Sequence, residues 1–288
     1  MARSVLVTGA NSGIGLVTCL ELASAGYDVV GSVRSAAKAD LVERAAAAKG
    51  VVVRTIELDV DDAASAEAGL KAFADLTGAG PWALVNNAGY AQTGAIEDVS
   101  DELARRQFET NVFAPMRLSR LVLPGMRERG DGRIVNISSI AGRLSTPLMG
   151  WYAGSKHALE ALTDAMRIEV SQDGIRVVLI EPGMFGTDIW SAAQDGGFPD
   201  PTSARYAAAY AHAESLAHRS HRLPDPVWVA RTIRVALTNP VPMARYLVGV
   251  DAVGGALAET LLPAPVMDYA KAVLSGLKRL PVKVPFLP

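Results

Sequence analysis

A tyrosine and a lysine four residues apart are the pair in this sequence whose spacing most directly suggests acid–base chemistry. Tyr152 and Lys156 lie in the segment WYAGSKH (151–157), which continues with the apolar spacing of a helix. Side chains four residues apart on a helix share one face. A nearby ammonium group favours the phenolate, so Lys156 should lower the pKa of Tyr152 from ~10 toward neutrality. The pair predicts a general acid/base; a packed tyrosine beside a solvated lysine is the alternative.

A glycine-rich turn, TGANSGIG (8–15), joins a short apolar segment to a helical pattern. Backbone N–H groups at the start of a helix suit a pyrophosphate group. The spacing is G-x3-G-x-G rather than G-x-G-x-x-G, and glycines also end strands for conformational reasons. The turn therefore indicates nucleotide binding without establishing it. The residues expected at such a site are Gly9, Asn11, Ser12, Gly13, Ile14 and Gly15.

These two features are set in a chain of alternating short apolar runs and longer helical segments. The alternation predicts βα units, hence a parallel sheet between two layers of helices. Strands covered on both faces need no polar alternation, as seen here. The predicted strands are 5–8, 28–33, 51–58, 82–86, 133–138, 175–181 and 246–250. The predicted helices are 14–25, 36–49, 63–76, 103–129, 152–172 and 226–238.

Composition narrows the class of protein. The 288 residues are 50% hydrophobic and 20% charged, which is a globular composition, and no linker divides the chain, so one domain over 1–288 is expected. A net charge of -2 without a long cationic run argues against nucleic-acid binding. Neither a signal peptide nor ~18 uninterrupted apolar residues are seen, which predicts a cytoplasmic protein. The single cysteine, Cys19, is expected to be a small buried side chain.

Further motifs occur in a fixed order with the first two. They are NNAG (86–89), Asn111, the serine pair 138–139, YAGSK (152–156), and PG (182–183) followed by Thr187. Together they resemble the classical short-chain dehydrogenase/reductase family, from about residue 3 to residue 250. The resemblance implies a Rossmann-type, doubly wound, parallel seven-stranded sheet. It also implies an oxidoreductase that moves hydride between a nicotinamide and a carbonyl or alcohol.

The resemblance implies a role for each residue of the catalytic set. Tyr152 would exchange a proton with the substrate oxygen, and Lys156 would also hold the nicotinamide ribose hydroxyls. Ser139 would hydrogen-bond the substrate oxygen. Ser138 competes for that role but is disfavoured, because neighbouring residues of a strand point opposite ways. Asn111 would help to hold a water chain to the lysine; an asparagine at a local helix bend is the alternative.

Cofactor preference is expected to be set at the end of the second predicted strand. NAD enzymes commonly place an acidic residue there. This chain has Val33 followed by Arg34, and an arginine suits the 2'-phosphate of NADP(H). Ser32 and Lys38 could assist. The other implied contacts are Asp59 and Val60 at the adenine; Asn87, Ala88 and Gly89 at the adenosine; and Pro182, Gly183 and Thr187 at the nicotinamide and pyrophosphate. For Asn87 a purely structural role is the alternative.

The substrate is predicted to be a lipophilic ketone or secondary alcohol. Segment 186–224 is a long excursion between a strand and a helix, which is typical of a substrate lid. Apolar and aromatic residues there and beside the catalytic pair would line the pocket. They are Ile189, Trp190, Phe198, Tyr206, Tyr210 and Leu216 in the excursion, and Leu144, Met149 and Trp151 beside the pair.

The C-terminal extension, about 252–288, loosely resembles the steroid 17-beta and retinol-type branch of the family. Its apolar helical segment 266–280 is expected to pack on this chain or a second subunit rather than on lipid. The resemblance implies a homodimer or homotetramer. No metal is expected, because the spacing of His212, His218 and His221 fits no common ligand set.

A second class of function is a catalytically silent NADP(H)-binding sensor or scaffold, because a fold does not fix a function. The feature that separates the two classes is the complete set of Asn111, Ser139, Tyr152 and Lys156. A sensor would have no chemical need of all four.

Overall fold

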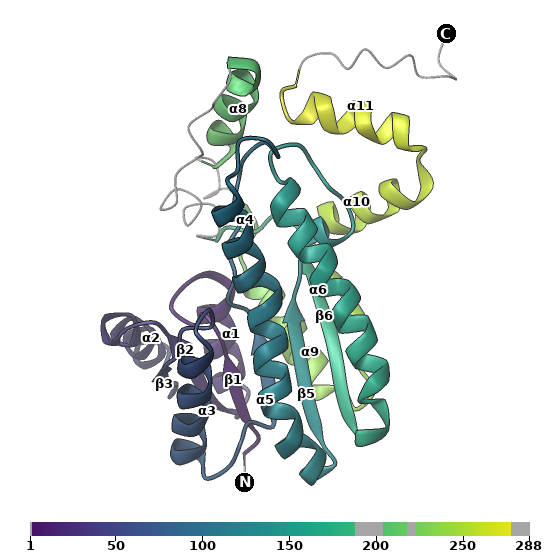
Figure 1. Cartoon of the computed structure of the whole chain (residues 1–288). Coiled ribbons are helices and arrows are strands. Elements are labelled where there is room, and N and C mark those ends of the chain that lie inside the picture. The colour runs from purple at the N-terminus through teal and green to yellow at the C-terminus, as the bar shows by residue number, and fades with distance from the viewer. Residues whose placement is uncertain (1, 188–203, 218–222, 278–288) are drawn as a thin grey trace.

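The computed structural model describes residues 2–187, 204–217 and 223–277. Its centre is one seven-stranded sheet, in the order β3-β2-β1-β4-β5-β6-β7, in which every neighbouring pair is parallel (Figure 1). The predicted seven-stranded parallel sheet is confirmed. The strands are β1 Ser4–Val7, β2 Asp28–Val33, β3 Arg54–Glu57, β4 Ala83–Asn86, β5 Gly132–Ile137, β6 Ile175–Pro182 and β7 Arg245–Val248.

Helices cover both faces of the sheet because successive strand residues point to opposite sides. Val5 and Val7 belong to one buried cluster, and Leu6 belongs to the other. The first cluster includes residues of α1 (Gly13–Ser24), α2 (Ala36–Ala48) and α9 (Val227–Thr238); the second includes residues of α3 (Ala63–Thr77), α5 (Ala114–Arg129) and α6 (Gly150–Glu169). Cys19 is fully buried in the first cluster, as predicted, and burial raises the pKa of its thiol to about 12.

The continuous helix predicted over 103–129 is wrong. Helix α4 (Asp101–Phe108) is followed by a π-helical turn, Glu109–Phe113, before α5 begins. Pro115 has no N–H to donate to the carbonyl of Asn111 four residues earlier, so one hydrogen bond of a regular α-helix is missing at this point. The interruption lies at Asn111, for which a local helix bend was the alternative role, and Pro115 was a signal for it in the sequence.

Three helices lie beyond the carboxyl ends of the strands (Figure 1). They are α8 (Ala207–Ala217), α10 (Val250–Leu261) and α11 (Ala264–Leu274). The C-terminal helix thus begins and ends earlier than the predicted 266–280. Tyr210 of α8 accepts a hydrogen bond from the N–H of Ala95 and donates one to Asp98, both at 2.8 Å. Much of the predicted lid, 186–224, lies outside the described residues.

No helix in the described part of the chain is long and apolar enough to cross a bilayer. The single domain over 1–288 stays a prediction.

Candidate functional site

A cavity of about 1050 Å³ opens at the carboxyl ends of the parallel strands. Ligands of open parallel sheets bind at this edge, because strand ends and helix starts meet there. All but two of the predicted site residues line it. They are Gly9, Asn11, Ser12, Gly13, Ile14, Arg34, Asp59, Val60, Asn87, Ala88, Gly89, Ser139, Tyr152, Lys156, Pro182, Gly183 and Thr187. The two residues that do not line it are Gly15 and Asn111.

The glycine-rich turn forms the floor of one end of this cavity. Gly9 and Gly13 have φ of +66° and +51°, a region that disfavours other residues. Glycine is required at position 15 for a different reason. A Cβ on Gly15 would lie 2.2 Å from the carbonyl oxygen of Gly9, so any side chain would prevent the turn from closing. The side chain of Ser12 makes no capping hydrogen bond to helix α1. The first N–H groups of α1 are therefore not capped by Ser12, and they lie at the wall of the cavity, as an anion site requires.

Asn87 both lines the cavity and holds two strand ends together. Its side-chain amide donates to the carbonyl of Thr8 at 2.9 Å. In return, the hydroxyl of Thr8 accepts from the N–H groups of Asn87 and Ala88, at 3.0 and 2.9 Å. The structural role that the sequence left open for Asn87 is thus present, and it fixes the turn after β1 against the end of β4.

The end of β2 brings together the residues expected to choose the cofactor. Ser32, Arg34 and Lys38 all line the cavity. The Oγ of Ser32 is buried without a hydrogen-bond partner in the described part of the chain. Neither Arg34 nor Lys38 forms an ion pair with a described residue. A phosphate would find one hydroxyl and two cations here.

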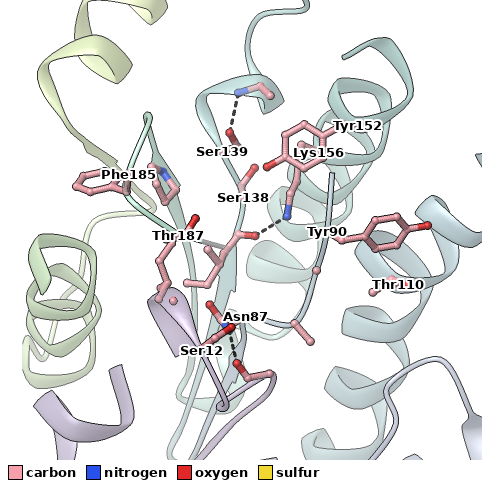
Figure 2. A pocket seen from close by; sticks show the side chains of 18 of the residues that line it. Ser12, Asn87, Tyr90, Thr110, Ser138, Ser139, Tyr152, Lys156, Phe185 and Thr187 are labelled. Atoms are coloured by element: carbon pink, nitrogen blue, oxygen red, sulfur yellow. Dashed lines mark hydrogen bonds between the residues drawn. The ribbon is translucent and has the colours of Figure 1, made fainter. Parts of the chain in front are cut away.

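A side wall that sequence reasoning missed is built by Tyr90, Arg106, Thr110 and Asp61. The hydroxyl of Thr110 donates to Asp61 at 2.9 Å, and burial raises the pKa of that carboxyl. Figure 2 shows the ring of Tyr90 directed away from Tyr152 and toward Thr110. The i, i+4 spacing of Arg106 and Thr110 was a usable signal, because it places both side chains on one helical face.

The opposite end of the cavity holds the tyrosine and the lysine. Both are 5% exposed, and Figure 2 shows the hydroxyl of Tyr152 directed toward the two serines. Ser139 lies beside the hydroxyl of Tyr152, and the Oγ of Ser139 accepts from the N–H of Ala141 at 3.1 Å. The ammonium of Lys156 donates to the carbonyl of Ile137 at 2.9 Å. These contacts hold the three polar side chains in one small volume.

The expected lowering of the Tyr152 pKa is wrong for this structure. Burial raises the pKa of Tyr152 to about 12, although the hydrogen bond with Ser139 opposes the rise. Burial also lowers the pKa of Lys156 to about 8. The ammonium lies 5.7 Å from the centre of the tyrosine ring. Desolvation outweighs its attraction for a phenolate. Tyr152 is consequently protonated at neutral pH and has a proton to give.

Strand β5 ends at Ile137, one residue earlier than predicted, but Ser138 still donates to the carbonyl of Ile180 and Ser139 keeps an extended backbone, so the argument from strand alternation stays a prediction. Both Ser138 and Ser139 line the cavity. The Oγ of Ser138 is buried without a hydrogen-bond partner among the described residues, whereas Ser139 contacts Tyr152.

Asn111 lies behind the cavity wall rather than in it. Its side chain donates to the carbonyl of Tyr90 at 3.0 Å and to the hydroxyl of Ser155 at 3.1 Å. The same hydroxyl donates to the carbonyl of Tyr152 at 2.7 Å. Asn111 therefore connects the segment after β4 to the first turns of α6 through side-chain contacts. The water chain implied for it stays a prediction.

We expect Lys156→Met to stabilise the fold at neutral pH. The pKa of Lys156 falls from 10.5 to about 8 on folding, so the unfolded chain holds this proton more tightly. The charged amine therefore destabilises the fold fully below about pH 8, and this destabilisation disappears as the pH rises toward 10.5. Removing the amine should add roughly 2 kcal/mol of stability at about pH 7 and much less at about pH 10. Urea unfolding at both pH values measures the difference.

Lys71→Met, at an exposed position on α3, is the matched control for that experiment. It should change the free energy of unfolding by the same small amount at both pH values. A Lys156→Met protein that is less stable than the wild type at neutral pH would contradict the prediction.

The substrate end differs in part from the prediction. Leu144 and Met149 line the cavity, but Trp151 does not: its indole donates to the carbonyl of Ile96 at 3.3 Å. Tyr206 and Tyr210 do not line it either. Ile189, Trp190, Phe198 and the side chain of Leu216 lie outside the described residues. Residues that sequence reasoning did not place here are Gln92, Ile140, Ala141, Thr146, Met184, Phe185, Asp251 and Leu274.

We expect Leu274→Ala to weaken the binding of bulky apolar ligands in this cavity. Leu274 lines the cavity from α11 although 74% of it is exposed, so a long substrate would cover it. Losing about 1 kcal/mol of apolar contact should raise the dissociation constant roughly fivefold for large apolar ligands and little for small ones. Leu261→Ala, at a 73% exposed position that does not line the cavity, is the control. Equal losses for both variants would contradict the prediction.

Metal ligands were not expected, and His218 and His221 lie outside the described residues. Among the described residues, no group of three or more His, Cys, Asp or Glu side chains could hold a metal ion.

Comparison with known proteins agrees with this geometry. Residues 3–196 match the short chain dehydrogenase family. The NADPH-dependent 3-dehydrocapnine reductase of Ornithobacterium rhinotracheale is 34% identical over 96% of this chain and 98% of its own. Human retinol dehydrogenase 5 is 32% identical over 92% of this chain and 86% of its own.

Solved structures are similar over most of their length. A short-chain dehydrogenase from Streptomyces avermitilis has a TM-score of 0.75 and 33% identity, covering 96% of this chain and 95% of that one. Actinorhodin polyketide ketoreductase with NADPH has a TM-score of 0.72 and 30% identity, covering 85% and 95%.

The chain belongs to the short-chain dehydrogenase family. Its fold and its site are accordingly those of an oxidoreductase.

Proposed function

We propose that the protein is an NADP(H)-dependent carbonyl reductase or alcohol dehydrogenase acting on lipophilic ketones or secondary alcohols. The observation that carries the proposal is the buried Tyr152 with Ser139 and Lys156 beside it, all in the same cavity as the glycine-rich turn and Arg34. A site that only sensed a dinucleotide would have no use for a buried proton donor at the far end.

The residues present fit a dinucleotide phosphate. The turn at 8–15 lines the cavity with Gly9 and Gly13, which carry no side chains, so its backbone N–H groups are open to a pyrophosphate. Ser32 has an unpartnered buried hydroxyl beside Arg34 and Lys38, which suits a 2'-phosphate. NADPH appears in the names of the 3-dehydrocapnine reductase and ketoreductase relatives, which supports the same cofactor here.

The cofactor and the side chains of the protein would supply different parts of the reaction. When bound, NADPH supplies the hydride that reduces the carbonyl carbon. Tyr152 donates the proton that the carbonyl oxygen then requires, which its high pKa favours in the reductive direction. Ser139 hydrogen-bonds the same oxygen as negative charge develops on it. Lys156 is close enough to stabilise the phenolate left on Tyr152 and to hold ribose hydroxyls.

The lining supports a lipophilic substrate. Apolar side chains from four separate segments surround the catalytic end and outnumber the polar ones there, which are Gln92, Thr146 and Asp251 beside the two serines. They are Ile140, Ala141, Leu144, Met149, Met184, Phe185 and Leu274.

The test is NADPH consumption with a panel of steroid, decalone and aryl ketones beside small polar carbonyls. We expect kcat/KM to rise with the apolar surface of the ketone. Turnover of small polar carbonyls alone would reject the substrate class. Tight NADPH binding without turnover of any carbonyl would favour the sensor.

We also propose that the protein forms a homo-oligomer and that it is located in the cytoplasm. Light scattering on the purified protein decides the first, because a monomer would refute it.

A further inference from the structure

We propose that Glu181 is a positioning residue, which with Arg143 and Arg245 fixes the loop bearing Ser139 against the helix bearing Tyr152. This inference rests on the proposed function and adds to it a determinant that lies outside the cavity. None of the three residues lines the cavity, so they act through other residues and not on the substrate.

Glu181 is a fully buried carboxylate on β6, directly before Pro182 and Gly183. Both of its oxygens accept from Arg143: Oε2 from Nε, and Oε1 from Nη2 at 3.1 Å. Oε1 also accepts from Nη1 of Arg245 at 3.0 Å. Charge-assisted, bidentate contacts of this kind are both strong and geometrically specific, particularly where water is excluded.

Arg143 transmits this constraint to Ser139. The two residues flank a 3-10 turn, Ile140–Gly142, in which Gly142 donates to the carbonyl of Ser139 at 2.8 Å and Arg143 to that of Ile140 at 2.9 Å. On the other side, the N–H of Ser138 donates to the carbonyl of Ile180 at 2.8 Å. The loop is thus tied to strand β6 at both of its ends, once by backbone and once by Glu181.

Arg245 extends the same contacts to helix α6. Its guanidinium bonds to Glu160 and Asp164, which follow Lys156 by one and two helical turns. The loop also touches the helix directly, because a Cβ on Gly142 would lie 2.8 Å from the side chain of Glu160. Arg167 completes the group with a 2.6 Å bond to Asp164. Three carboxylates therefore face three guanidinium groups.

The effect of removing one charge follows from this arrangement. In Glu181→Gln an amide oxygen in the place of Oε1 can still accept from Arg143 and Arg245, but the amide NH2 in the place of Oε2 would face the Nε–H of Arg143 with a donor. Arg143 and Arg245 would then be adjacent like charges with one acceptor less between them. Their repulsion should displace the loop and with it the hydroxyl of Ser139.

The experiment compares Glu181→Gln with Glu21→Gln, which breaks the partly buried ion pair of Glu21 with Arg234 away from the cavity. For Glu181→Gln we expect kcat to fall at least tenfold, while the NADPH dissociation constant stays within twofold. Alcohol oxidation, which needs deprotonated Tyr152, should reach half its maximum at higher pH, because the hydrogen bond that lowers the tyrosine pKa is weakened. Glu21→Gln should keep kcat and the pH profile unchanged.

A structural measurement makes the result independent of turnover. Hydrogen exchange at the amides of 140–144 should be at least tenfold faster in Glu181→Gln and unchanged in Glu21→Gln. If Glu181→Gln does not fold, Arg143→Lys is the second variant, because it keeps the charge but loses the bidentate contact. It should change kcat, the pH profile and the exchange rates in the same directions but by less. Unchanged exchange, or unchanged kcat in an active enzyme, overturns the inference. A wild type inactive on every carbonyl refutes the proposed function instead, and the exchange comparison still decides the positioning role.

Discussion

Tyr152→Phe should lower kcat for ketone reduction by about 10²–10⁴-fold, because a positioned general acid contributes that much. The substitution removes one hydroxyl and leaves the ring, which is buried beside Lys156. Ser139 then remains as a hydrogen-bond donor to the substrate oxygen, but no group delivers the proton that the product requires. Residual activity should show little dependence on pH, because water would be the proton source.

The binding of NADPH separates loss of chemistry from loss of the site. Its dissociation constant, followed by fluorescence, should change less than twofold in Tyr152→Phe. Tyr27→Phe is the matched control, because it removes a hydroxyl that contacts Thr238 far from the cavity. A Tyr152→Phe enzyme that keeps a tenth or more of the wild-type kcat would show that another group donates the proton.

Arg34→Ala should lower the preference for NADPH over NADH by about 10–100-fold. Arg34 lines the cavity at the end of β2 without an ion-pair partner among the described residues, and a hydrogen bond to a charged group is worth roughly 1.5–3 kcal/mol. NADH lacks the 2'-phosphate, so its kcat/KM should change little. Adding Val33→Asp should reduce NADPH use further, because a carboxylate would repel the phosphate and accept from ribose hydroxyls.

The ratio of kcat/KM for the two cofactors is the measurement. Arg44→Ala, on the exposed side of α2 and away from the cavity, should leave that ratio as it is in the wild type. A wild-type enzyme that favours NADH by about tenfold or more would contradict the assignment before any variant is made.

The sequence predicted those parts of the site that lie at the carboxyl ends of the strands. In a parallel sheet the carboxyl ends of all strands meet at one edge, so the turn after β1, Arg34 after β2, and Ser139 after β5 had to converge. The seven strands were recognisable because runs of Val, Ile and Leu buried on both faces differ from helical periodicity. The position of Tyr152 and Lys156 on one face followed from their spacing.

What the sequence did not predict depends on burial and on contacts between distant segments. The spacing of Tyr152 and Lys156 says nothing of how completely water is excluded from them, so it gave the wrong direction for the tyrosine pKa. Arg143 and Glu181 carry no local pattern that marks them as partners. Leu274 reaches the cavity only because α10 and α11 fold back over the strand ends.

The π-helical turn at Glu109–Phe113 has a consequence for aligning this chain with others. Each residue added to or removed from a helix rotates everything after it by about 100°. Because a π-helical turn takes up one residue more than an α-helical turn, deleting one residue within it would make the helix regular and keep the buried face of α5, including Leu118 and Met126, turned to the core. A relative whose helix is continuous here should therefore show a one-residue gap within 109–113, with its packing register restored on either side.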